Sequence, residues 1–294
     1  MSITLSVSLP NEHLQTLLES VIIIYEAAFP ERVRGYYVVG SMSSNTAIPN
    51  SDIDMYVLFK GDWQDEEQAR QAEIKAGCRG LSPVHLDLPA IAEADLAHYD
   101  TVALKLGSTL VYGEDTRAEM PLPTMDTYLR WITTPVQRGL TYRFRQERVS
   151  LPLSYPDASD NYYGYIPPLY LTTPAPLKYW AVHVGWLATF RVVTTANVYV
   201  PAKSTLLSLY QAHVADEFTE LIETVLRVIR QTWHYELPQH EADRTILDDA
   251  FQHTLVFENA IAKDYLAYLQ QMPADYADIA RERLATFNRN IKSP

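Results

Sequence analysis

The sequence predicts an α/β (α+β) fold class for the first part of the chain, with a mixed sheet and flanking helices, followed by a C-terminal helical bundle. Helix-like and strand-like segments alternate up to about residue 122. Pro121–Pro123 then interrupts the pattern, and from Met125 onward the apolar residues follow mostly helical spacing. We therefore expect two domains, residues 1–122 and residues 123–294.

The N-terminal elements are predicted from apolar spacing and from turn residues. A helix is expected over Glu12–Phe29, capped by Asn11 and ended by Pro30. Segments rich in aromatic and β-branched residues predict strands. The expected strands are Tyr36–Val39, Ile53–Phe59, Val84–Leu88 and Ser108–Tyr112, and the other expected helices are Ser41–Ala47 (a short helix or a turn), Glu66–Ala76 and Ala90–Leu106.

The second part of the chain is mostly helical in its periodicity. The expected helices are Tyr128–Arg148 with an interruption at Pro135, Lys178–Val193, Ser204–Ala215, Glu217–Tyr235, Asp243–Phe257, Ala260–Met272 and Asp275–Ile291. Between them, residues 151–177 form an irregular stretch rich in proline and tyrosine, and long loops of this kind are usually functional or disordered. Its tyrosines are open to two interpretations, a lid over a substrate or a structural loop.

Composition indicates a soluble globular protein with a sizeable core, since 47% of the 294 residues are hydrophobic and 20% are charged. No apolar run is longer than Val21–Tyr25, which is far too short to span a membrane. No basic segment precedes an apolar stretch at the N-terminus, so we expect no signal peptide. The single cysteine, Cys78, excludes intrachain disulfides and suits a reducing compartment, so we expect a cytoplasmic protein.

The net charge of −12 is unevenly distributed along the chain. Residues 1–125 hold 8 basic and 18 acidic residues, a balance of −10, whereas residues 126–294 hold 16 and 18, a balance of −2. A protein that binds a nucleic-acid backbone normally shows a basic patch, so we expect no such binding. An acidic surface suits a cationic or neutral small substrate, although it also simply favours solubility.

Two carboxylates, Asp52 and Asp54, are placed on one face of the second expected strand, because side chains two residues apart in a strand point the same way. Carboxylates held this close repel each other unless a cation lies between them, and their oxygens suit Mg²⁺. If the third strand pairs beside the second, Asp87 becomes a third carboxylate of the same cluster. The sequence therefore predicts a metal site.

The segment Gly40-Ser41 supplies the second half of this prediction. Glycine lets a ligand approach the backbone closely, and N–H groups at a strand-to-helix turn favour an anion. A phosphate group beside a divalent metal ion is therefore expected here. Two nearby groups stay ambiguous: His85 belongs either to the site or to the strand packing, and Glu114-Asp115 either lines a substrate pocket or forms a solvated turn.

Gly40-Ser41, Asp52-Ile-Asp54 and Asp87 together resemble the signature of the nucleotidyltransferase family related to DNA polymerase β, and within it the chain looks most like the antibiotic (aminoglycoside) nucleotidyltransferases. The resemblance implies that residues 1–122 form the nucleotidyltransferase catalytic domain. It also implies that residues 123–294 form a helical domain that binds the substrate and the nucleotide.

The resemblance also implies roles for individual residues. Asp52, Asp54 and Asp87 would be catalytic and would bind two Mg²⁺ ions, with Asp87 acting either as a metal ligand or as the general base. Ser41 would contact the phosphates of ATP, or of another nucleoside triphosphate, and Lys203 would reach them from the helical domain. Apart from the resemblance, the departing pyrophosphate needs countercharge, which Ser41, the backbone at Gly40, and Lys203 or Lys178 would supply.

The expected function is thus Mg²⁺-dependent transfer of a nucleoside monophosphate, AMP from ATP, to a hydroxyl group of a small molecule such as an aminoglycoside. Two alternatives stay open. The acceptor would instead be a protein or an RNA, as in toxin–antitoxin modules, or the domain would be a catalytically inactive nucleotide-binding module.

Overall fold

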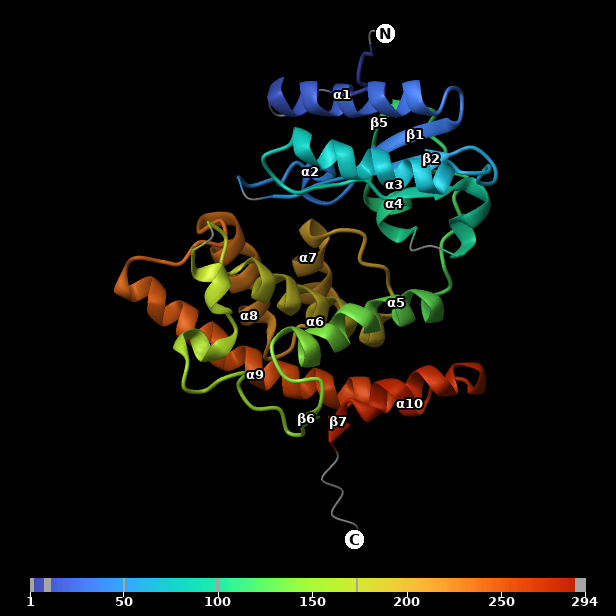
Figure 1. Ribbon diagram of the computed structural model, residues 1–294. Coiled ribbons are helices and arrows are strands. Elements are labelled where there is room, and N and C mark those ends of the chain that lie inside the picture. Colours follow the sequence, from blue (N-terminus) through green and yellow to red (C-terminus); the bar gives the residue numbers. More distant parts are fainter. Residues whose placement is uncertain (1–2, 8–11, 50, 99–100, 173, 289–294) are drawn as a thin grey trace. The chain divides into compact units, whose positions relative to one another are not determined.

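The computed structural model describes residues 3–7, 12–49, 51–98, 101–172 and 174–288 (Figure 1). The chain divides into two compact units, residues 1–126 together with 199–205, and residues 127–198 together with 206–294. The predicted fold class is confirmed, because a mixed α/β sheet unit precedes a largely helical one. The segment Tyr199–Thr205 belongs to the first unit. The predicted division of the chain at residue 122 would have placed this segment in the second domain.

The sheet of the first unit is built around two long antiparallel strands. Strand β1 pairs with β2 on one side and with β5, also antiparallel, on the other. The opposite edge of β2 is occupied by two short parallel strands in succession, β3 and then β4. The bounds are β1 Val33–Val38, β2 Ile53–Phe59, β3 Leu86–Asp87, β4 Ala90–Ala92 and β5 Thr109–Gly113.

The predicted helix over Ala90–Leu106 is wrong. Its first three residues form β4, which pairs with Val57–Phe59, and only after a 3₁₀ helix over Glu93–His98 does α4 begin, at Val102–Gly107. Alanine and leucine favour helices in isolation, but the unpaired edge of β2 and the burial of Ile91 against the sheet override that preference.

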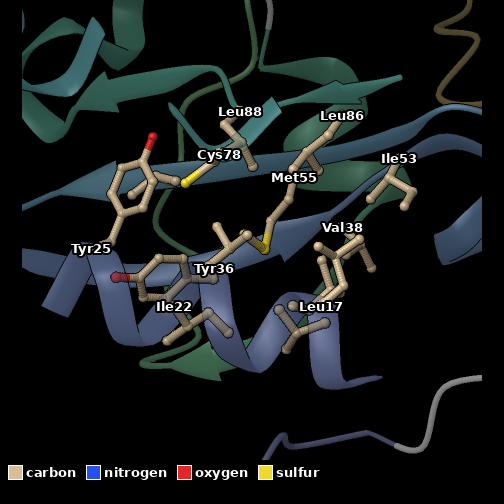
Figure 2. Packing of buried hydrophobic residues seen from close by; sticks show 14 of the residues in the cluster. Leu17, Ile22, Tyr25, Tyr36, Val38, Ile53, Met55, Cys78, Leu86 and Leu88 are labelled. Atoms are coloured by element: carbon tan, nitrogen blue, oxygen red, sulfur yellow. The ribbon is translucent and has the colours of Figure 1, made fainter. Parts of the chain in front are cut away.

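The two faces of the sheet are covered by different elements. Helices α1 (Glu12–Ala28) and α3 (Glu67–Cys78) share one buried cluster with alternate residues of β2, including Met55 (Figure 2). A second cluster includes Leu58 of β2 together with Leu104 of α4. Because side chains alternate along β2, the even-numbered positions of this strand share the second face. The predicted Asn11 cap lies outside the described residues.

The second unit is helical apart from one short pair of strands, β6 (Val149–Ser150) and β7 (Phe287–Asn288). Its α-helices are α5 Met125–Arg138, α6 Lys178–Ala196, α7 Lys203–His213, α8 Thr219–Glu223, α9 Glu241–Gln270 and α10 Ala277–Ala285. The first residues of α5 and of α7 belong to the first unit. No helix among the described residues is both long enough and apolar enough to cross a membrane.

Several predicted helix limits in this unit are wrong. The helix predicted over Tyr128–Arg148 ends as α5 at Arg138 and continues only as a π-helical turn to Arg143. The two helices predicted over 243–272 are one helix, α9, since no glycine or proline separates them. The helix predicted over Glu217–Tyr235 is α8 followed by a π-helical segment, Thr224–Thr232.

The C-terminal helix is also shorter than predicted. Helix α10 ends at Ala285 rather than continuing to Ile291, because Phe287 and Asn288 pair with β6 instead. Residues 289–291 of that prediction lie outside the part of the chain that the structure describes.

A buried group of charged and polar side chains joins the irregular stretch 151–177 to the helices of the second unit. Glu258 of α9 is fully buried and accepts two hydrogen bonds from Arg145, at 3.0 and 2.6 Å. Tyr165 donates to the same carboxylate at 2.6 Å, and His183 Nε2 lies 2.8 Å from it. Burial opposes the ionisation of Glu258, but Arg145 and His183 outweigh it and lower its pKa to about 2.

Gly139 is required by the position of His183 in this group. A Cβ atom at residue 139 would lie 1.9 Å from His183 Nδ1, so no larger residue fits without displacing the ring. Burial lowers the pKa of His183, which favours a neutral ring that donates from Nε2 to Glu258. Tyr165 is fully buried and stacks on Phe251. At this residue, the stretch 151–177 therefore has the role of a structural loop and not of a lid.

Glu258→Gln is predicted to destabilise the second unit strongly, because it leaves the buried guanidinium of Arg145 without an anionic partner. We expect the free energy of unfolding to fall by about 3 kcal/mol. The matched control is Glu223→Gln in the exposed pair with Arg227, which should cost less than about 1 kcal/mol. Chemical denaturation of both variants measures the difference, and equal losses would contradict a stabilising role for the buried group.

Candidate active site

Asp54 and Asp87 are brought together by the parallel pairing of β2 and β3. The two residues are direct partners in the register, and neighbouring strands lie about 4.8 Å apart. Asp52 precedes β2 by one residue and shares the face of Asp54. The strand pairing on which a cluster of three carboxylates depends is therefore present.

The electrostatics of Asp54 indicate which groups surround it. Burial raises the pKa of Asp54, and the negative charges of Asp52 and Asp87 raise it further. Lys203 and His85 act in the opposite direction and lower the pKa of Asp54. These five side chains therefore interact within the first unit, and His85, which is exposed, belongs to the surroundings of the carboxylates rather than to the strand packing.

The turn at Gly40 closes one side of this cluster. Gly40 has a φ of 65°, a left-handed conformation that favours glycine. The N–H of Val39 donates to the carbonyl of Asp54 at 3.0 Å, and a Cβ atom on Gly40 would lie 3.8 Å from Asp54 Oδ2. Ser41 follows as the second residue of the short helix α2 (Gly40–Ser43). The predicted phosphate-binding turn thus lies directly against the carboxylates.

Lys203 reaches the first unit because the segment before it is fixed there. The hydroxyl of Tyr199 donates to the carbonyl of Pro123 at 2.5 Å. Pro201 packs so tightly on α4 that a Cβ atom at Gly107 would lie 2.6 Å from its carbonyl oxygen. Lys178, by contrast, is the first residue of α6 in the second unit, and its contact with phosphate stays a prediction.

Lys75, which no sequence pattern indicates as a site residue, forms an ion pair with Asp87. Its Nζ lies 2.5 Å from Asp87 Oδ1, with the side chains 24% and 38% exposed. With Asp87 turned to this lysine, no three His, Cys, Asp or Glu side chains in the described ranges are placed to hold one metal ion. A lysine on a surface helix such as α3 carries no local sequence signal for this contact, because its partner comes from a separate strand.

Glu114 and Asp115 both have arginine partners. Glu114 pairs with Arg34 at 2.7 Å, and Asp115 pairs with Arg117 at 2.6 Å. Of the two interpretations of this segment, the structure therefore favours the turn, held by ion pairs rather than simply solvated, over a substrate pocket.

The residues present fit a divalent metal ion by the chemistry of their donors. Asp52, Asp54 and Asp87 offer only carboxylate oxygens, which are the ligands that Mg²⁺ prefers. Their mutual repulsion raises the pKa of Asp54, and a bound cation would relieve it. The group is therefore suited to Mg²⁺ once Asp87 turns from Lys75 to the other two carboxylates.

Comparison with known proteins agrees with the resemblance to nucleotidyltransferases. Residues 22–97 match the model of the nucleotidyltransferase domain, a span that includes Gly40, Asp52, Asp54 and Asp87. No curated protein matches the chain. Among solved structures, the chain is similar to the spectinomycin adenyltransferase AAD(9) from Enterococcus faecialis, solved with ATP and spectinomycin, at 13% identity and a TM-score of 0.49, covering 83% of this chain and 98% of the other.

A second solved structure, a toxin–antitoxin complex with AMP-PNP, shares 22% identity with a TM-score of 0.27 and covers 40% of this chain and 90% of the other. These structural similarities are too weak to carry an argument about substrate. The family assignment depends instead on the matched domain and on the motif residues within it. Residues 22–97 therefore form a nucleotidyltransferase domain of the DNA polymerase β type, and such a domain indicates a transferase of nucleotidyl groups.

Proposed function

We propose that this protein transfers AMP from ATP, with Mg²⁺, to a hydroxyl group of a small cationic molecule of the aminoglycoside kind. The single observation that carries the proposal is the register of β2 and β3, which makes Asp54 and Asp87 direct partners beside the turn at Gly40. Three carboxylates and one lysine around a glycine turn are the groups that nucleotidyl transfer needs, anionic ligands for metal ions and a cation for the phosphates.

Each residue has a distinct task in this mechanism. Asp52 and Asp54 would hold two Mg²⁺ ions, which when bound would neutralise charge on the phosphates and lower the barrier to displacement. Asp87, whose side chain is 38% exposed, would accept the proton of the acceptor hydroxyl or complete the metal site. Lys203 and the backbone at Gly40 and Ser41 would stabilise the departing pyrophosphate.

The charge distribution supports a cationic acceptor. The catalytic half, residues 1–125, carries 8 basic against 18 acidic residues. Such a field raises the local concentration of a polycation and disfavours a polyanion. Incubation with each nucleoside triphosphate, Mg²⁺ and a panel of amino sugars, proteins and RNAs tests this, with pyrophosphate release expected for an amino sugar and ATP. Release with a protein or RNA alone would instead assign a macromolecular acceptor.

Asp52→Asn is predicted to reduce metal-dependent transfer at least about 100-fold, because it removes an anionic ligand that the metal site requires. The unfolding temperature should stay within a few degrees of the unmodified protein. Pyrophosphate release under saturating ATP measures the effect, with Asp248→Asn on the exposed face of α9 as the matched control. Turnover retained in Asp52→Asn would show that the active site lies elsewhere.

Asp54→Asn is predicted to raise the stability of the metal-free protein at pH 7. The pKa of Asp54 is raised in the folded protein, so folding favours the protonated carboxyl group. The free energy of unfolding therefore falls as the pH rises through this raised pKa and the carboxylate becomes charged. Asparagine removes the repulsion that remains at neutral pH. Thermal unfolding in a chelator should show a higher midpoint for the variant at pH 7 and a smaller difference near pH 4. A lower midpoint at pH 7 would contradict this assignment.

Lys75→Met is predicted to lower the Mg²⁺ concentration at half-maximal activity by about two- to fivefold, which is the range for a partly exposed ion pair. The lysine competes with the metal for Asp87, so its removal favours the metal. Activity titrated with Mg²⁺ measures the effect, with Lys263→Met on exposed α9 surface as control. A higher Mg²⁺ requirement would mean that Lys75 instead holds Asp87 in its ligating position.

A further inference from the structure

The first unit contains a cavity of about 330 Å³ at one end of the buried cluster that α1 and α3 share with β2. Figure 2 shows Leu17 and Ile53 together at that end of the cluster. The floor of the cavity is apolar and buried, since Leu14, Leu17 and Ile53 are only 4%, 5% and 3% exposed. Its walls are also largely apolar: Met42, Ala47, Ile48, Pro49, Pro83 and Val84.

This cavity and the carboxylate cluster lie on opposite faces of β2. Ile53 packs toward α1 and α3, whereas Asp54 is the next residue of the strand and points to the other face. The described residues that line the cavity all belong to the first unit, as do the three carboxylates, so the separation holds within one compact unit. A molecule in the cavity would therefore not occupy the proposed metal site.

Two serine hydroxyl groups supply hydrogen-bond donors in the lining. Ser51 Oγ accepts a hydrogen bond from the N–H of Ile48 at 2.9 Å, and Ser82 Oγ accepts one from the N–H of Val84 at 3.2 Å. A hydroxyl group that accepts a hydrogen bond can still donate its own proton. Within the described ranges, neither hydroxyl proton has an acceptor. Because Ser51 is 9% exposed, its proton is also largely shielded from water.

The chemistry of the lining favours an uncharged ligand. No Asp, Glu, Lys or Arg side chain of the described residues lines the cavity, so an ionised group would lose its hydration here without gaining an ionic partner. A carbonyl oxygen has two lone pairs and can accept a hydrogen bond from each of two hydroxyl groups. A cavity of about 150 Å³ is enough to hold benzene, so the larger volume here suits a body of one or two fused rings.

We propose that this cavity binds a neutral, largely apolar molecule of one or two fused rings that carries a carbonyl group. The carbonyl oxygen would accept hydrogen bonds from the hydroxyl groups of Ser51 and Ser82. The rings would lie against Leu14, Leu17 and Ile53, and their removal from water would supply most of the affinity. This binding goes beyond the proposed nucleotidyl transfer and does not depend on it.

The probe for this site is 2-acetylnaphthalene, which joins two fused rings to one carbonyl group. Calorimetric titration of the full chain without Mg²⁺ should give saturable binding to one site. The carboxylate analogue, 2-naphthoate, should bind at least about tenfold more weakly, because its charge has no partner in the cavity. Absence of saturable binding by 2-acetylnaphthalene, or equal affinity for 2-naphthoate, would overturn the proposal.

Ser51→Ala and Ser82→Ala test the hydrogen bonds to the carbonyl group. Each should weaken binding of 2-acetylnaphthalene about three- to tenfold, the scale of one hydrogen bond. Binding of 2-ethylnaphthalene, which has nearly the same shape but no carbonyl, should stay unchanged in both variants and so shows that the cavity is intact. If neither variant weakens binding of the ketone more than binding of the hydrocarbon, the assignment of a carbonyl ligand is wrong.

Ala47→Phe tests the place of binding, because it adds a ring at the exposed rim of the cavity and should abolish binding of both naphthalenes. The matched control is Ser20→Ala on α1, which removes a hydroxyl group that bonds to the carbonyl of Thr16 and does not line the cavity. Ser20→Ala should leave both affinities unchanged. Binding retained in Ala47→Phe would place the probe elsewhere on the protein and overturn the proposal.

Discussion

Repulsion among three carboxylates is the constraint on which the first unit depends. The parallel register of β2 and β3 makes Asp54 and Asp87 direct partners, and the alternation of β2 adds Asp52. Such a group is stable only if cations surround it, and the metal-free protein supplies them from two distant segments, Lys75 on α3 and Lys203 after Pro201. The glycine turn at Gly40 lies against the same cluster, so the backbone proposed to bind phosphate and the side chains proposed to bind metal are positioned by the same strands.

The residues of this cluster could be predicted from the sequence because they follow local rules. Alternation along a strand is a local property, so the shared face of Asp52 and Asp54 follows from their spacing alone. The pairing of the third strand with the second was a conditional prediction, and the structure confirms it. The contact of Lys75 with Asp87 could not be predicted, because it joins a helix to a strand and no sequence pattern in either segment indicates that the two lie together. Strand β4 was missed for a similar reason, since its alanines favour a helix until the open edge of β2 is known.

The second unit uses its charged residues in two opposite ways. Glu258 accepts hydrogen bonds from Arg145 and Tyr165 where no water reaches it, and His183 completes the arrangement. Such a group gives a helical bundle a unique packing, because any shift leaves a buried charge without its partner. A few residues away, Arg143 faces a cavity instead. Sequence periodicity predicted most of these helices but could not distinguish the two arginines, because burial and not residue type decides their roles.

The return of Tyr199–Thr205 to the first unit has a consequence for modularity. The peptide chain passes from one unit to the other three times, after residues 126, 198 and 205. A gene fragment that ends at the first of these crossings therefore encodes a sheet without Lys203 and without the tyrosine that anchors its segment to Pro123. The first unit is thus not encoded by one continuous segment that could be transferred by itself. Recombination that exchanged the part of the chain after residue 126 would also exchange Lys203, which acts on Asp54, so the two units are linked in inheritance.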